Sequence, residues 1–346
     1  MKNILICLLL LNFSLNQQEI RIINSKNNNN YDMENNSSSK KNLILGIIHN
    51  YSLKRILPFF KSLIYTNITN CDIIMFVRNV SPAVINYLNK INVIVYKINK
   101  EYKEIKPTHI RWKLYFELLK EKINQYNLVF SADVRDTIFQ KDIFSYYENY
   151  SSFLGITLED GTLSDEWNKN NIINYVGENI YKTIENERII CMGTLLGTLL
   201  IFMNFSKIIW NKLKSNNFPP SDQCVANCLF YIEKCLKNYL VKSDNKGPIM
   251  TLAISKSEDI ILDFENNVLN YNNKIAAVIH QYDRIKFLKK IINMKYHFQY
   301  KDLIISGLDI HIYKIIFYIF VLIILLVTKK YSKKTKLFFI NYFKNK

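Results

Sequence analysis

Two acids and a base follow an apolar run near the middle of the chain. The run YNLVFSA (126–132) leads into Asp133, Arg135 and Asp136. Two carboxylates at the end of a buried strand are suited to holding Mg²⁺ or Mn²⁺ together with a diphosphate. An arginine between them can pair with phosphate oxygens or orient a neighbouring acid. The alternative is a capped turn before a helix over DTIFQKDIF, and the spacing leaves both open.

A histidine ends a later apolar run, IAAVIH (275–280), and opens the segment HQYDR. The neutral imidazole of His280 is suited to completing a metal shell that is otherwise made of oxygens. The alternative is a histidine with a purely structural role.

Three further groups carry residue types suited to binding or catalysis. Asp222 and Gln223 open a helix, where they place an acid and an amide beside a sugar hydroxyl or where Asp222 is simply a cap. Gly193 and Gly197 allow a ligand close to the backbone or mark a strand bulge. Arg111 lies one turn inside a predicted helix, where phosphates bind well, or it is an exposed arginine.

A strand–helix alternation in the first half of the chain supplies the elements that position these residues. Strands are predicted at NLILGIIHN (42–50), CDIIMFV (71–77), INVIVYKI (91–98) and YNLVFSA, and helices at LKRILPFFKSLIYT (53–66), SPAVINYLNK (81–90) and THIRWKLYFELLKEKI (108–123). This order predicts an α/β fold with a parallel sheet that is covered on both faces. Ligands bind at the carboxyl ends of such strands, where Asp133 and the stretch His49–Tyr51 are expected.

The second half is less regular. FLGIT is predicted as a strand, EDGTLSDEWNKNN (159–171) as a loop and MGTLLGTLLIFM as an apolar, glycine-containing segment. Helices are predicted over FSKIIWNKLK (205–214), capped by Ser206, and over SDQCVANCLFYIEKCL (221–236), capped by Ser221 or Asp222.

The ends of the chain predict a membrane protein. Residues 1–16 have the pattern of a signal peptide, 17–41 read as a disordered Asn-rich spacer, and 42–300 form the folded domain. Residues 310–328 are apolar over a membrane-spanning length, and the basic tail 329–346 follows. Because positive charge stays cytoplasmic, the expected protein is a single-pass type I protein of the secretory-pathway membrane (ER/Golgi or cell surface) with a lumenal domain.

Charge and cysteine usage exclude some classes. The net charge is +17, but the chain has no zinc-finger spacing and no RNA-binding motif, so nucleic acid is not an expected partner. The positive charge is equally compatible with a lumenal protein that binds anionic sugar nucleotides. Six cysteines include Cys7 of the signal, and without a CxxC motif the remaining five indicate no zinc site. One disulfide is compatible with an oxidising compartment, in a pairing that the sequence leaves open.

The order of these motifs resembles that of GT-A-type nucleotide-sugar glycosyltransferases, in the variant where DxRDxxFQ replaces a plain DxD. The resemblance covers roughly residues 42–290 and is carried mainly by NLVFSADVRDTIFQKDIF and AAVIHQYDR, with SDQCVANCLFY and the Gly193–Gly197 segment in support. It implies a GT-A-like (Rossmann-like), mostly parallel sheet flanked by helices. Arg135 departs from the family pattern, because it occupies the place of the second acid in DxD.

The resemblance also implies roles for individual residues. Asp133, Asp136 and His280 would bind a divalent ion, Mn²⁺ or Mg²⁺, with the donor diphosphate. Ile47, His49 and Asn50 would line the base pocket, Arg111 and Arg135 would lie near the phosphates, and Gly193 and Thr194 would lie along the donor sugar. Asp222 and Gln223 would face the acceptor. An inverting reaction needs a base there, for which Asp222 is the candidate, whereas a retaining reaction needs none, and the sequence leaves the two open.

The sequence therefore predicts a membrane-anchored lumenal glycosyltransferase that moves a sugar from a nucleotide-sugar donor to a glycan, protein or lipid acceptor. One alternative is a surface protein that keeps the GT-A fold, has lost catalysis, and binds glycans or partners. Another is a HAD-like phosphatase that begins at LVFSADVRDT. That chemistry needs Asp, any residue, then Asp, and Arg135 stands where the second Asp belongs.

Overall fold

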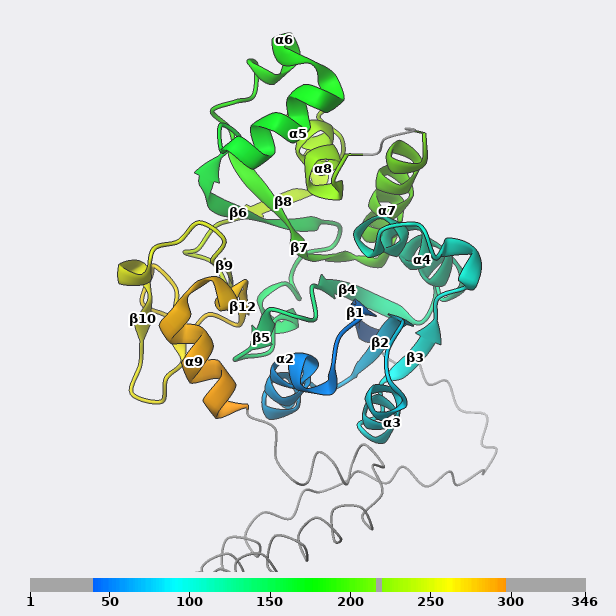
Figure 1. The fold of residues 1–346 in the computed structure, drawn as a ribbon, viewed down its shortest axis with the longest axis vertical. Coiled ribbons are helices and arrows are strands. Elements are labelled where there is room, and N and C mark those ends of the chain that lie inside the picture. Colours follow the sequence, from blue (N-terminus) through cyan, green and yellow to red (C-terminus); the bar gives the residue numbers. More distant parts are fainter. Residues whose placement is uncertain (1–39, 216–219, 297–346) are drawn as a thin grey trace, which may run out of the picture. The chain divides into compact units, whose positions relative to one another are not determined.

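The computed structural model describes residues 40–215 and 220–296. Their centre is a seven-stranded mixed sheet in the order β3-β2-β1-β4-β7-β6-β8 (Figure 1). Its strands are β1 (Lys41–His49), β2 (Cys71–Arg78), β3 (Ile94–Lys97), β4 (Tyr126–Ala132), β6 (Leu154–Thr162), β7 (Arg188–Thr198) and β8 (Leu240–Ser243). Four of the six pairings are parallel, and β7 is antiparallel to both β4 and β6. The predicted α/β class with a mostly parallel sheet is confirmed.

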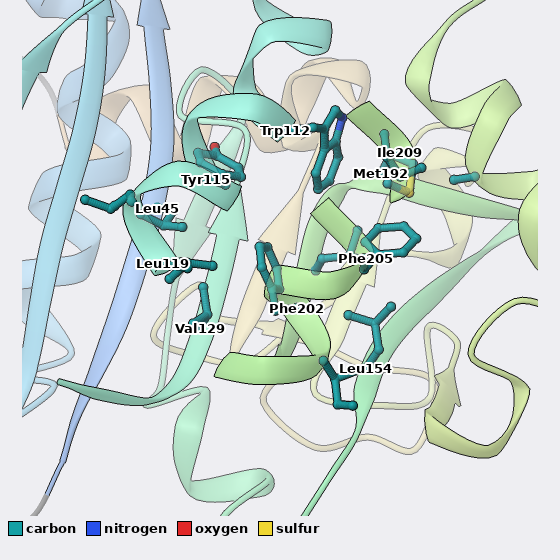
Figure 2. Packing of buried hydrophobic residues seen from close by; sticks show 14 of the residues in the cluster. Leu45, Trp112, Tyr115, Leu119, Val129, Leu154, Met192, Phe202, Phe205 and Ile209 are labelled. Atoms are coloured by element: carbon teal, nitrogen blue, oxygen red, sulfur yellow. The ribbon is translucent and has the colours of Figure 1, made fainter. Parts of the chain in front are cut away.

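Helices cover both faces of this sheet, because side chains along each strand alternate between the faces. On one face, α4, α7 and α8 bury a core with Leu45 and Val129, and Figure 2 shows Trp112, Phe202 and Phe205 interlocked there. On the other face, α2 and α3 pack against Ile44 and Phe130. The helices concerned are α2 (Leu53–Tyr65), α3 (Pro82–Lys90), α4 (Pro107–Glu121), α7 (Leu199–Lys214) and α8 (Asp222–Tyr231).

A small second sheet brings the end of the domain back to the middle of the chain. It has the order β5-β12-β9, with β5 (Thr137–Phe139), β9 (Ile249–Thr251) and β12 (Val278–His280). His280 is in register with Thr137 on one side and Thr251 on the other. This pairing places HQYDR beside the segment that follows Asp133. The remaining elements are α5 (Glu166–Val176), α6 (Glu178–Tyr181), α9 (Lys286–Lys295), the hairpin β10 (Ile261–Leu262) and β11 (Val268–Leu269), and the short 3-10 helices η1 (Lys100–Tyr102), η2 (Phe144–Tyr146), η3 (Lys237–Tyr239), η4 (Ser257–Asp259) and η5 (Tyr282–Arg284).

The structure excludes one alternative and contradicts two local predictions. A helix does not start at DTIFQKDIF, because residues 137–139 pair with β12 as β5. The segment 159–171 is the end of β6 followed by α5, where Asp165 accepts hydrogen bonds from the backbone of Trp167 and Asn168. Ser206 caps nothing, since it lies inside α7 and its hydroxyl donates to the carbonyl of Phe202. The apolar run 199–205 extends that helix toward its N-terminus.

Asparagine occupies left-handed turn positions that are usually occupied by glycine. Seven asparagines among the described residues have φ between 49° and 61°, a left-handed conformation in which Asn costs less than most residues. They are Asn50, Asn67, Asn70, Asn79, Asn92, Asn266 and Asn273. Asn50 follows β1 and Asn79 follows β2, so this glycine-poor chain turns on asparagine at the carboxyl ends of both strands.

Several predictions concern residues that lie partly or wholly outside the described ranges. Strand β1 begins at Lys41, one residue before the predicted start of the folded domain, and residues 17–39 of the predicted spacer lie outside the described residues. None of the helices in 40–215 and 220–296 has the length and apolarity to cross a membrane, and the predicted span 310–328 lies outside those residues, as does the predicted signal peptide. Cys71, Cys191, Cys224, Cys228 and Cys235 are all free thiols.

Candidate functional site

The candidate site is a cleft of about 250 Å³ where β1 and β4 end. The residues that line it are Ile47, His49, Tyr51, Pro107, Thr108, Arg111, Asp133, Arg135 and Asp136. Strand β1 contributes Ile47 and His49, and the N-terminus of α4 contributes Pro107 and Thr108. The turn after β4 contributes the charged side chains. The cleft thus lies at the edge of the sheet where the strand order predicts a ligand.

Three potential metal ligands converge at this cleft. One ligand atom from each of Asp133, Asp136 and His280 lies within 4.8 Å of the other two. The Nε2 atom of His280 is 3.8 Å from Oδ2 of Asp133 and 3.7 Å from Oδ1 of Asp136. These separations exceed normal hydrogen-bond lengths. Accordingly, Nε2 of His280 and Oδ1 of Asp136 are buried atoms without a hydrogen-bond partner among the described residues.

Each of the two acids has one oxygen held by an arginine. Arg111 donates to Oδ1 of Asp133 at 2.7 Å, and Arg135 donates to Oδ2 of Asp136. The second oxygen of each carboxylate is the one nearest the imidazole of His280. Arg135, which stands where a plain DxD motif has its second acid, therefore fixes the orientation of Asp136 and lies 3.9 Å from the carboxylate of Asp283.

The cluster fits a divalent cation. Two carboxylate oxygens and one imidazole nitrogen are a donor set that Mn²⁺ and Mg²⁺ accept. Buried polar atoms are normally hydrogen-bonded, so two orphan atoms facing one point indicate a missing partner. Gly193 supplies the necessary space, because a Cβ atom there would lie 2.1 Å from the His280 ring and 3.0 Å from Asp133.

The charges of the cluster shift its pKa values in opposite directions. Burial raises the pKa of Asp133, but Arg111 and His280 outweigh this and lower it. Burial and the charge of Asp133 raise the pKa of Asp136, against the opposing effects of His280 and Arg135. Burial lowers the pKa of His280, yet Cys191 and the two acids raise it well above its ordinary value. The two acids thus favour a positive charge at this point, which a proton on His280 or a bound cation can supply.

Arg111 is enclosed by acceptors. Its Nε and Nη2 atoms donate to Oδ2 of Asp222 at 3.1 and 2.6 Å, and Nη2 also donates to the carbonyl of Met192 at 2.9 Å. The same Oδ2 accepts from the indole of Trp112 at 3.0 Å. Burial lowers the pKa of Arg111, but Asp222 and Asp133 raise it far more. The guanidinium is thus a permanent cation beneath the cleft.

These contacts give no support to Asp222 as a general base. A base needs a free lone pair within reach of the acceptor hydroxyl. Oδ2 of Asp222 accepts three hydrogen bonds, Oδ1 accepts from the backbone of Gln223, and the residue is 5 % exposed. The observed position is that of an anchor for Arg111, on the first turn of α8, with Ser221 as the helix cap.

The other predicted binding residues lie at different depths. Ile47 and His49 line the cleft, and Nδ1 of His49 accepts a hydrogen bond from Arg78 at 3.2 Å. Asn50 is exposed beside the His49 ring and does not line the cleft. Gln223 donates to Asn168, away from the three ligands. Thr194, next to Gly193, is fully buried in β7 and its hydroxyl has no partner among the described residues.

Sequence reasoning missed several residues around the cluster. Tyr51 belongs to the predicted strand-end stretch His49–Tyr51 but had no predicted role of its own; it lines the cleft, and its ring lies 5.3 Å from the guanidinium of Arg55. Glu159 is 3 % exposed, and burial raises its pKa to about 7. Thr251 and Cys191 contact the His280 ring at 3.3 Å each. Tyr51 adjoins a strand end, but no spacing in the sequence connects Glu159, Cys191 and Thr251 with His280.

Comparison with known proteins gives similarity of fold. No protein-family model and no curated protein matches the chain. A solved structure of WbbM, described as a bifunctional glycosyltransferase, is 12 % identical with a TM-score of 0.51, over 79 % of this chain and 52 % of WbbM. The chain thus spans about half of WbbM.

Two further structures have lower scores. LgtC, described as a galactosyltransferase in complex with donor and acceptor sugar analogs, is 14 % identical with a TM-score of 0.46, over 76 % of this chain and 99 % of LgtC. GlyE of Streptococcus pneumoniae TIGR4, described as a glycosyltransferase, is 13 % identical with a TM-score of 0.45, over 78 % of this chain and 62 % of GlyE.

The space at Gly193 yields a direct test of the cluster. In Gly193→Ala the new methyl group would displace the His280 ring, and we expect Mn²⁺ affinity, measured by electron paramagnetic resonance of the free ion, to fall about tenfold or more. Gly161→Ala is the control, because its Cβ would meet mainly the flexible end of Ile254. Equal Mn²⁺ affinity in Gly193→Ala and wild type would show that His280 is not a ligand.

Proposed function

We propose that this chain is a metal-dependent glycosyltransferase of the GT-A type, which uses a nucleotide-sugar donor and Mn²⁺ or Mg²⁺. The observation that carries the proposal is the Asp133–Asp136–His280 cluster with its unpartnered ligand atoms, at the rim of a cleft where β1 and β4 end. The fold shared with WbbM supports it. The DxRDxxFQ pattern gives the two acids the spacing of a donor-phosphate site.

The charge balance of the cleft favours a cation before an anion. Four carboxylates, those of Asp133, Asp136, Asp222 and Asp283, are bridged by only two guanidiniums, Arg111 and Arg135. With His280 neutral, this set has a net charge of −2. Without a metal ion this negatively charged set would repel a diphosphate. A bound divalent cation makes the set neutral, so that a diphosphate can approach.

The cleft walls are suited to the nucleoside part of a donor. Ile47 and Tyr51 offer apolar and aromatic surface, and the His49 ring is held from behind by Arg78. Arg78 is itself fixed by hydrogen bonds to the carbonyls of Tyr102 and Ile105 at 2.8 and 2.9 Å. A planar group entering beside His49 and Tyr51 would meet a preformed surface, which lowers the entropy cost of binding.

Transfer of the sugar requires that negative charge on the leaving diphosphate be stabilised. When bound, the metal ion would supply this charge stabilisation as a Lewis acid. The residues of the chain hold Asp133 and Asp136 in fixed orientations through Arg111 and Arg135, so little reorganisation accompanies the reaction. Asp222 contributes by holding Arg111, which in turn holds Asp133. We assign Asp222 this positioning role in place of the general base.

The acid cluster makes the catalytic proposal testable. Full-length protein should hydrolyse at least one member of a panel of sugar nucleotides in the presence of Mn²⁺, and Asp136→Asn should lower that rate about a hundredfold or more. Asp263→Asn is the control, because this distant acid only accepts hydrogen bonds within its own turn. Full activity in Asp136→Asn would refute the metal assignment. Mn²⁺ binding without turnover of any donor would favour the glycan-binding alternative.

We also propose that the domain is lumenal and anchored by residues 310–328, on the basis of that apolar segment and the seven lysines of the tail that begins at Lys329. In sealed microsomes, protease added from outside should remove only the short tail and leave the domain intact. Digestion of the domain without detergent would contradict this topology.

A further inference from the structure

We propose that Thr251 and Cys191, with Gln281 and Glu159 behind them, fix the imidazole of His280 with its proton on Nδ1 and its lone pair on Nε2, aimed at the two acids. The inference rests on the proposed function, in which His280 is a metal ligand. A histidine ligand binds through a bare nitrogen, and the partner of its other nitrogen decides which nitrogen is bare.

The first branch passes through Thr251. Its hydroxyl lies 3.0 Å from Oε1 of Gln281, an oxygen that can only accept, so the hydroxyl proton points to Gln281. The same Oγ1 lies 3.3 Å from Nδ1 of His280. With its own proton directed away, Thr251 presents a lone pair to Nδ1. Register supports this arrangement, because Thr251 and His280 are directly paired in β9 and β12.

The second branch passes through Cys191. Sγ of Cys191 lies 3.3 Å from Nδ1 of His280 and 3.4 Å from the hydroxyl of Thr251, and the thiol lowers the pKa of the neighbouring Glu159 against the effect of burial. When Glu159 is ionised it accepts the thiol proton, and the sulfur lone pairs are then left for His280. With Thr251 as an acceptor and Cys191 able to accept, Nδ1 is the nitrogen that carries the proton.

The opposite nitrogen is then available to a ligand. Within residues 40–215 and 220–296, Nε2 has no hydrogen-bond partner, and it lies 3.7 to 3.8 Å from an oxygen of each acid. Thr251, Cys191 and His280 are each 1 % exposed, and Glu159 is 3 % exposed, so bulk water does not compete for these contacts. The low surrounding dielectric makes each oriented hydrogen bond matter more than it would at a surface.

Gln281 couples this network to the acids. Its backbone N–H donates to the carbonyl of Asp136 at 2.7 Å, while its side chain accepts from Thr251. Gln281 holds φ at 58°, a left-handed conformation that is unfavourable for a residue with a Cβ atom. Strain of this kind persists where the surroundings enforce it and tends to cluster at functional sites. Here it lets one residue orient both sides of the cluster.

Substitution of Thr251 tests the positioning role by metal binding alone. In full-length protein, Thr251→Val keeps the side-chain shape but removes the acceptor, and Mn²⁺ affinity measured by electron paramagnetic resonance should fall about tenfold. Thr251→Ser keeps the hydroxyl and should restore affinity to within about twofold of wild type. Gln281→Leu removes the nearer acceptor of the Thr251 proton, at 3.0 Å against 3.4 Å for Sγ of Cys191, and should shift affinity in the same direction as Thr251→Val.

A spectroscopic measurement on the wild type needs no variant for its main result. Full-length protein carrying ¹⁵N-labelled histidine and saturated with Mg²⁺ should show one N–H on His280, at Nδ1, in solid-state NMR. The signals of His280 are identified among the five histidines by their loss in His280→Gln. A proton on Nε2 in the Mg²⁺ state, or His280 signals unmoved by Mg²⁺, would overturn the proposal.

The outcomes separate this inference from the proposed function. Equal Mn²⁺ affinity in wild type, Thr251→Val and Gln281→Leu would overturn the inference and leave the metal site standing. Absence of Mn²⁺ binding in the wild type would overturn both. A loss in Thr251→Val that Thr251→Ser does not restore would overturn the hydrogen-bond explanation, because a packing defect would then account for the loss.

Discussion

The site depends on one buried arginine shared between two carboxylates. Arg111 is 4 % exposed and bonds to Asp222 on α8, Asp133 after β4 and the carbonyl of Met192 on β7. A buried charge is tolerated only when it is paired and hydrogen-bonded, so each of these partners has little freedom to move. Removal of Arg111 itself would leave the carboxylates of Asp222 and Asp133 without their shared cation. The surrounding aromatic core of α4 and α7, with Trp112 bonded to Asp222, keeps water from this network.

From this anchor the cluster is built outward in a symmetrical manner. Arg111 binds one oxygen of Asp133, and Arg135 binds one oxygen of Asp136. The second oxygen of each acid faces His280, which belongs to the small second sheet. The second sheet is needed because only the pairing of β12 between β5 and β9 brings residue 280 back to residue 133. The absence of a side chain at Gly193 then lets the ring approach β7. The two acids, the His280 ring and Gly193 are in mutual contact, so a change at any one of them alters the positions of the others.

Much of this could be predicted from the sequence, and the reasons for the exceptions are physical. Strand ends are visible in the sequence, because an apolar run stops where the chain leaves the sheet, and Asp133, Asp136 and His280 were placed in this way. Contacts set by packing are not visible. Asp222 has the sequence context of a cap or a base, yet its partners on α4 are more than a hundred residues away. Thr251 and Glu159 have no distinctive neighbours, and only strand register brings Thr251 to His280. Likewise, β5 follows from pairing with a distant strand, against the local pattern of a helix.

The central claim is that Asp133, Asp136 and His280 bind one divalent cation. A crystal of the protein grown with Mn²⁺ and a nucleoside diphosphate, measured at the manganese absorption edge, tests it most directly. The account predicts a single strong anomalous peak at ligand distance, about 2.0 to 2.3 Å, from an oxygen of each acid and from Nε2 of His280. An ion bound elsewhere in the cleft, or a diphosphate bound on Arg111 and Arg135 without any ion, would contradict it.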